Sequence, residues 1–233
     1  MIIYGKNVIK EAIFAKRTIY KLYVDDQMND HRFLQFLADK NIKYQKSNKN
    51  ELNKLSTQQL HQGVVAEVED YQTYELSDVL DQTKIQQFVI LDGIEDPHNL
   101  GAVMRTAEAV QLDGIIMSKK GAVPLNATVA KVSSGAIEHV KIILVSNINQ
   151  AILELKKKGV WVIGTDGNTE KTYDDLPKHV SLAVVMGNEG EGVRPLVKQN
   201  CDLLVKIPMY GKINSLNVSV AAALMMYKMK ESL

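Results

Sequence analysis

The chain has 233 residues, of which 45% are hydrophobic and 24% charged, with a formal net charge of +1. These values suit a globular protein of one large or two modest domains and exclude an evenly basic nucleic-acid binder. No stretch approaches the roughly 20 apolar residues of a membrane span, the N-terminus lacks the features of a signal peptide, and a single cysteine excludes an internal disulfide framework. We therefore expect a cytoplasmic protein with no membrane association.

The first 70 residues have the pattern of a small α/β unit. Alternating branched and aromatic residues predict a strand over 18–25, and a helix over 31–41 places Phe33, Phe36 and Leu37 on one face. A short strand at 43–45, a helical turn at 50–55 and a strand at 64–69 follow. We expect one domain over 1–70 and a linker over 71–84.

Charge is distributed unevenly over this part of the chain. Met1–Ser56 holds eleven Lys or Arg against six Asp or Glu, whereas 57–83 holds six acids and no Lys or Arg. A basic unit followed by an acidic connector favours contact with phosphate groups. A normally solvated surface would give the same counts, so charge alone leaves both interpretations open.

The remainder, 85–233, alternates apolar strands with helices. Strands are predicted at 88–92, 114–118, 140–145, 160–165, 182–187 and 203–208, with helices around 100–110, 148–158 and 193–199 and an apolar stretch over 215–230. Runs of branched apolar residues are typical of strands that are covered on both faces. The pattern predicts a doubly wound α/β domain with a mostly parallel sheet.

Several chemistries are disfavoured by the sequence. It contains neither a G-x-G-x-x-G nor a G-x-x-x-x-G-K-[ST] motif, so a nicotinamide oxidoreductase is a remote alternative. The glycine-rich stretch 187–192 carries two carboxylates, which would repel a phosphate, and its glycines favour tight turns and close backbone approach. The five histidines lie far apart, so we expect no metal site.

Three segments at predicted strand ends carry the polar residues of a candidate site. They are Asp92–Thr106, Met186–Gly192 and Ile207–Val218. In open α/β sheets, ligands bind at the carboxyl ends of the strands, so these segments are expected to converge.

Together the three segments resemble, in order and spacing, the signature motifs of the SpoU/TrmH branch of the SPOUT methyltransferases. The segments Tyr4–Val8 and His61–Val64 resemble those of the RlmB group of bacterial 23S rRNA guanosine 2′-O-methyltransferases, and the N-terminal part resembles their L30e-like RNA substrate-binding domain. The resemblance implies S-adenosylmethionine as cofactor and RNA, most readily rRNA, as partner. It further implies a deep trefoil knot and a homodimer formed through the C-terminal domain over 85–233.

The resemblance also implies roles for individual residues. Asn99, Arg105, Glu189, Ser215 and Asn217 match active-site positions, and Gly187, Ile207, Leu216 and Asn217 match positions that hold the adenosyl moiety. The residues alone permit simpler interpretations: Asn99 as a helix cap, Arg105 as a solvated arginine opposite the apolar stripe, Glu189 as a turn carboxylate and Ser215 as the N-cap of the last helix.

Two further functions stay open at this point. One is a tRNA ribose methyltransferase, and the other is a non-catalytic RNA-binding factor of ribosome assembly. The N-terminal domain favours rRNA over tRNA, and the intact polar residues of the three motifs favour catalysis over binding alone.

Overall fold

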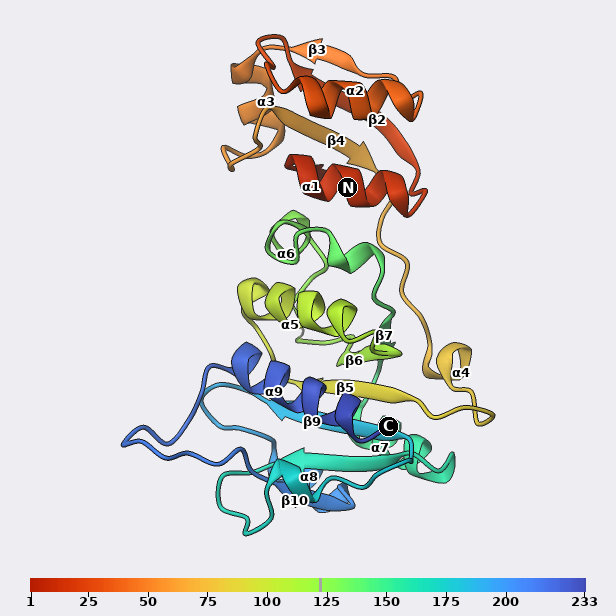
Figure 1. Ribbon diagram of the computed structural model, residues 1–233, viewed down its shortest axis with the longest axis vertical. Coiled ribbons are helices and arrows are strands. Elements are labelled where there is room, and N and C mark those ends of the chain that lie inside the picture. Colours follow the sequence, from red (N-terminus) through yellow and green to blue (C-terminus); the bar gives the residue numbers. More distant parts are fainter. Residues whose placement is uncertain (122) are drawn as a thin grey trace. The chain divides into compact units, whose positions relative to one another are not determined.

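A computed structural model describes residues 1–121 and 123–233. The chain forms two compact units: Met1–Tyr71 together with Leu125–His139, and Gln72–Pro124 together with Val140–Leu233 (Figure 1). The sequence division left Leu125–His139 within the second domain, whereas the structure groups this segment with the first unit. No described helix is both long and apolar enough to cross a bilayer.

The first unit is built on a four-stranded mixed sheet of order β1-β4-β2-β3. Its strands are β1 (Ile2–Tyr4), β2 (Ile19–Asp25), β3 (Gln45–Ser47) and β4 (Val64–Val68). Only β2 and β3 pair in parallel, with Asp25 opposite Ser47. β3 lies two residues later than the strand predicted at 43–45, and its last residue, Ser47, is buried.

Helices cover both faces of this sheet. They are α1 (Lys6–Phe14), α2 (His31–Asp39), α3 (Lys49–Leu55) and α6 (Ala127–Val132), the last followed by the 3-10 turn η1 (Ala136–Glu138). The side chain of Asp30 caps α2 by accepting a hydrogen bond from the Phe33 amide at 3.0 Å. Of the three residues predicted to share one face of α2, Phe33 and Leu37 are buried and Phe36 is half-buried.

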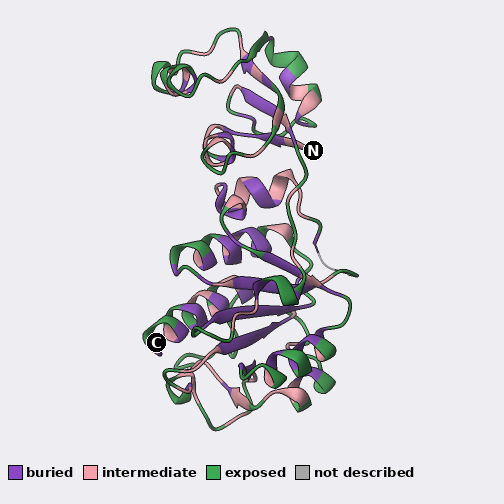
Figure 2. Cartoon of the chain, turned by 90° about the vertical axis from the view of Figure 1, so that its right-hand side faces the viewer, coloured by how far each residue is buried: buried purple, intermediate pink, exposed green. Residues whose placement is uncertain are grey.

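The second unit contains a six-stranded sheet of order β10-β8-β9-β5-β6-β7 in which every neighbouring pair is parallel. The strands are β5 (Gln87–Asp92), β6 (Gly114–Ser118), β7 (Ile142–Val145), β8 (Trp161–Thr165), β9 (Leu182–Gly187) and β10 (Leu203–Val205). The central strands are buried along their whole length (Figure 2). The predicted α/β class with a mostly parallel sheet is confirmed.

Helices pack on both faces of this second sheet (Figure 1). On one face lie α7 (Ile148–Lys157) and α8 (Pro195–Asn200), and on the other lie α5 (Pro97–Ala109) and α9 (Val218–Glu231). Two short helices, α4 (Leu76–Val79) and η2 (Tyr173–Asp175), complete the unit. Because α5 packs against α9, the first motif, which includes α5, lies close to the third motif, which leads into α9.

Candidate active site

The first and second motifs begin at adjacent strand ends. Asp92, the last residue of β5, is the register partner of Gly187, the last residue of β9. Since the two strands are parallel, the loops that follow them leave the sheet at the same edge. The third motif follows β10 and leads into α9, which packs on α5.

One chain of hydrogen bonds connects the three motifs. The Asn217 Nδ2 donates to the Asn99 Oδ1 at 3.0 Å, and the Asn99 Nδ2 donates to the Glu189 carboxylate. Asn99 is only 7% exposed. A buried amide has to satisfy both its donor and its acceptor, and Asn99 does so with residues 90 and 118 positions away.

Asn99 does not cap α5. The N-cap is Asp96, whose side chain accepts from the His98 amide at 2.9 Å, and Pro97 is the first helical residue. The simpler interpretation of Asn99 as a cap is therefore wrong. Its side chain is free for the contacts that join the motifs.

The last helix begins two residues later than the sequence indicated. Asn217 is the N-cap of α9, and its Oδ1 accepts from the Ser219 amide at 2.9 Å and the Ser219 hydroxyl at 2.6 Å. The simpler interpretation of Ser215 as the N-cap is wrong, since Ser215 lies in the loop before the helix and Asn217 caps it. Asn217 thus fixes the start of α9 with one end of its amide and Asn99 with the other.

A cavity of about 430 Å³ opens between the second and third motifs and the end of β8. Of the residues predicted to hold the adenosyl moiety, Gly187, Ile207 and Leu216 line it, as do Glu189 and Ser215. Asn217 is not among the described residues that line it. Apolar side chains form much of the wall: Met186, Val193, Val205, Met209 and Val218.

The glycine-rich loop over 187–192, which follows β9, is tightly closed. Asn188 and Gly192 exchange backbone hydrogen bonds of 3.2 and 2.9 Å. A β-carbon at Gly187 would overlap the backbone of Gly192 and Val193, so only glycine fits at the end of β9. All six residues of the loop, Gly187–Gly192, line the cavity.

A second cavity of about 290 Å³ lies beside the same loop, at the ends of β5 and β6. Its lining includes charged and polar side chains, among them Glu95, Ser118 and Lys120. The buried Asp92 accepts from the Arg194 Nε at 2.8 Å and from the Arg194 amide at 3.1 Å. This hydrogen bonding raises the pKa of Arg194 above its ordinary value. The ion pair fixes the chain that leaves the glycine-rich loop.

The sequence and fold of this site match one family. The family model described as the SpoU rRNA Methylase family matches residues 86–227, which is more than half of the chain. The chain belongs to the SpoU family. The family uses S-adenosylmethionine. A second model, described as RNA 2′-O ribose methyltransferase substrate binding, matches residues 2–74.

Curated relatives of this SpoU-family chain extend over nearly its whole length. YacO of Bacillus subtilis (strain 168), assigned to the TrmH family of tRNA/rRNA methyltransferases, is 42% identical over 231 residues, covering 96% of this chain and 92% of YacO. A protein of Staphylococcus aureus (strain MSSA476) with the same assignment is 42% identical over 234 residues, covering 97% and 94%.

Solved structures of SpoU methyltransferases share the fold. AviRb from Streptomyces viridochromogenes, in complex with AdoMet, has a TM-score of 0.85 at 21% identity, covering 99% of this chain and 89% of that one. An AdoMet-bound rRNA methyltransferase from Sinorhizobium meliloti has a TM-score of 0.84 at 24% identity, covering 100% and 87%. At these identities the likeness concerns the fold alone.

Arg105 lies apart from the hydrogen-bonded chain. It is exposed on α5, six residues beyond Asn99, and it makes no hydrogen bond or ion pair with any other described residue. The structure thus joins four of the five predicted catalytic residues around the loop and cavity: Asn99, Glu189, Ser215 and Asn217. The guanidinium of Arg105 faces solvent, with its donors available to a bound molecule.

Sequence reasoning missed Asp166 in the cavity of this SpoU-family site. Asp166 directly follows β8 and lines the larger cavity together with Lys198, to which it is paired at 2.9 Å. The backbone hydrogen bond from Asn168, with a smaller contribution from Lys198, lowers the pKa of Asp166. The sequence offers a signal for Asp166, because it directly follows a predicted strand, as the polar residues of the three motifs do.

Proposed function

We propose that this chain transfers the methyl group of S-adenosylmethionine to a ribose 2′-hydroxyl of RNA. The observation that carries the proposal is the hydrogen-bonded chain Asn217–Asn99–Glu189, which joins three distant motifs beside a cavity of suitable size. The test is methyl transfer to RNA with the product digested to nucleosides. A 2′-O-methylated nucleoside supports the proposal, and a base-methylated one overturns it.

The larger cavity fits the cofactor by the chemistry of its lining. Backbone groups of Gly187, Ile207 and Leu216 would meet the polar edge of an adenine, and apolar side chains would enclose its ring. The carboxylate of Asp166, paired with Lys198 in the same wall, offers an acceptor for the polar groups of a bound cofactor. The cofactor supplies an activated methyl on a sulfonium, so no metal is needed for this step.

The chain's own residues would align the 2′-oxygen and manage its proton. Because a guanidinium group is a poor base, Arg105 would bind a neighbouring phosphate and stabilise the developing alkoxide rather than remove the proton. Asn99 and Asn217 would fix the geometry, and Glu189 would orient a donor of the substrate. Ser215, exposed in the loop before α9, would contact the substrate directly.

The favoured substrate is a guanosine of 23S rRNA, as in the RlmB group. The match of residues 2–74 to a substrate-binding family supports an L30e-like RNA-binding domain at the N-terminus. The methyltransferase domain proposed over 85–233 gives up Leu125–His139 to the first unit, and most of the expected linker over 71–84 folds with the second unit instead. The assignment of YacO covers both tRNA and rRNA, so tRNA is the competing substrate. Parallel assays on 23S rRNA and on tRNA distinguish them.

We further propose a homodimer formed through the second unit. Val220, Leu224 and Tyr227 of α9 are 50, 44 and 56% exposed and recur at helical spacing, which leaves an apolar stripe uncovered. A second copy would cover it. Light scattering should give twice the chain mass, and Leu224→Glu should give the monomer.

The proposed trefoil knot rests on the path of the chain after β10. From the end strand of the sheet, residues 206–217 lead to α9, which packs against α5 and β9 on the opposite face from α8. A knotted chain resists mechanical extension to its full contour length. Pulling on both termini should therefore leave a shortfall in the extended length.

A further inference from the structure

One segment from the middle of the methyltransferase sequence folds as part of the first unit. Residues Leu125–His139 lie in the sequence between β6 and β7 of the second unit, but they pack with Met1–Tyr71. We call Leu125–His139 the inserted segment. The methyltransferase family model, 86–227, includes it, whereas the substrate-binding family model ends at residue 74. The segment therefore falls within the span matched by the methyltransferase model, yet it folds with the unit that contains most of the substrate-binding match.

The inserted segment completes the core of the first unit. Ala127 of α6 packs against a buried cluster of Tyr4, Leu52 and Val65 on one face of the four-stranded sheet. Val129 and Ala130 of the same helix are fully buried. Without α6, these apolar side chains would be exposed to water.

Two glycines permit this close packing. Gly5 and Gly135 both have positive φ angles, +97° and +91°. A β-carbon at Gly5 would lie 2.5 Å from the Lys131 Nζ, and one at Gly135 would lie 2.6 Å from the Glu11 Cβ. One glycine lies near the N-terminus and the other in the inserted segment. Each lets the backbone approach a side chain of the opposite segment more closely than a β-carbon would allow.

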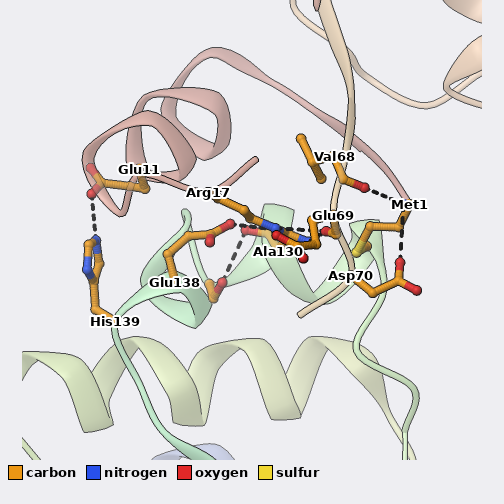
Figure 3. Close-up of polar contacts among 10 residues, drawn as sticks. Met1, Glu11, Arg17, Val68, Glu69, Asp70, Ala130, Glu138 and His139 are labelled. Carbon is orange, nitrogen blue, oxygen red and sulfur yellow. Dashed lines mark hydrogen bonds and ion pairs between the residues drawn. The ribbon is translucent and has the colours of Figure 1, made fainter. Parts of the chain in front are cut away.

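A buried ion pair holds the inserted segment in place (Figure 3). The Arg17 Nη1 lies 2.7 Å from the Glu138 Oε1, and their side chains are 7 and 4% exposed. Arg17 also donates from Nε to the Glu69 carbonyl at 2.9 Å and stacks 3.7 Å above the Tyr71 ring. At the end of the segment, His139 contacts Glu11 at 2.9 Å.

The inserted segment gives the first unit three covalent connections to the second. They lie at Tyr71/Gln72, Pro124/Leu125 and His139/Val140. Lys120 and Gly121 of the second unit line the smaller cavity, and Leu125 follows four residues after Gly121 in the sequence.

We propose that the inserted segment, held by Arg17 and Glu138, presents RNA bound on the first unit to the active site. The proposal rests on the proposed function. While the segment is packed in the first unit, three chain connections join that unit to the second and restrict where bound RNA can go. If the segment is released from the first unit, only the Tyr71/Gln72 connection still joins the two. A longer, freer connection lowers the effective concentration of the target ribose at the site. Arg17 and Glu138 are therefore positioning residues.

The test uses two full-length variants. Glu138→Leu leaves the buried Arg17 without a negatively charged partner, and the double variant Arg17→Met/Glu138→Leu removes both charges. A buried charge is tolerated poorly alone, whereas an apolar pair of similar size usually packs. Lys156→Met is the matched control, because it removes a 2.8 Å ion pair with Asp202 inside the second unit. Hydrogen exchange of 125–139, methyl transfer to rRNA, rRNA affinity and S-adenosylmethionine stoichiometry are measured for each.

For Glu138→Leu we expect faster exchange over 125–139 and a kcat at least tenfold lower, with rRNA affinity within about threefold of wild type and one cofactor bound per chain. The double variant should recover most of the kcat, and the control should match wild type. Unchanged kcat despite faster exchange overturns the proposal, as does a loss that lies entirely in rRNA affinity. If the wild type methylates no RNA, the proposed function fails instead, and the exchange data still test how the segment is held.

Discussion

The carboxamides of Asn99 and Asn217 are joined by a 3.0 Å hydrogen bond across 118 positions of sequence. Asn99 lies in the first turn of α5, and Asn217 caps α9. The bond therefore ties the start of one helix to the start of another, and Glu189 extends it to the glycine-rich loop. The central feature of the site is this connection, which no single motif could form.

Replacing Asn99 by alanine should disable the site while leaving the fold intact. The change leaves Glu189 and Asn217 without their partner, and an unmade hydrogen bond at a buried position costs about 1–3 kcal/mol of stability. Methyl transfer should fall at least a hundredfold. Thermal unfolding and a radiolabelled-methyl assay measure the two effects.

The matched control is Asn149→Ala, which removes a 2.8 Å amide–amide hydrogen bond to Asn200 elsewhere in the same unit. It should keep wild-type activity. Equal activity losses in both variants would indicate general destabilisation and argue against a role for Asn99.

Arg105→Ala should separate catalysis from folding. Because Arg105 is exposed and has no partner among the described residues, unfolding and cofactor binding should stay near wild type while methyl transfer falls by orders of magnitude. Arg105→Lys keeps the charge but loses the planar bidentate fork, so it should recover little activity. Glu108→Ala, exposed on the same helix, is the control. Wild-type rates in both Arg105 variants would show that Arg105 is an ordinary solvated residue with no role in catalysis.

Lysines of the first unit should account for part of the salt dependence of RNA binding. Lys43, Lys46 and Lys49 are exposed around β3 and form no ion pair with any described residue. If each contacts a phosphate, replacing all three by alanine should reduce the slope of log K against log salt by about 2 for single-stranded RNA. The control is the triple alanine variant of the exposed Lys157, Lys158 and Lys178 in the second unit. Equal slopes in the two triple variants would place RNA binding elsewhere.

Cys201 should react slowly with alkylating reagents at neutral pH. Burial, with a smaller contribution from the charge of Asp202, raises the pKa of Cys201 to about 11. The thiolate is the reactive species, so its fraction is small at pH 7 and grows tenfold with each pH unit below the pKa. Iodoacetamide labelling followed by mass spectrometry over pH 7–10 measures it, and rapid labelling of the folded protein at pH 7 would contradict the buried environment.

The sheet and the three motifs were predictable from sequence because each depends on local pattern. Apolar runs such as those ending at Asp92 and Gly187 mark buried parallel strands, and polar residues directly after them mark the binding edge. The order and spacing of the three polar motifs then indicate the family. These signals need no knowledge of distant contacts.

The grouping of Leu125–His139 with the first unit was not predictable in this way. The apolar residues Val129 and Ala130 suit a helix that packs on either unit, and nothing local indicates that Glu138 pairs with Arg17, 121 positions away. The start of α9 was misplaced for a related reason. Ser215 is as good a cap as Asn217 by residue type, and only the contact of Asn217 with Asn99 decides between them.

The most direct test of the central claim is to incubate the protein with S-adenosylmethionine and ribosomal RNA from cells that lack its gene. Nuclease digestion and mass spectrometry then identify the methylated nucleoside and its position. We predict one 2′-O-methylguanosine in 23S rRNA, absent when Arg105→Ala replaces the wild type. Methylation of a base, or of no RNA at all, would contradict the account, and methylation of tRNA alone would move the substrate to the competing class.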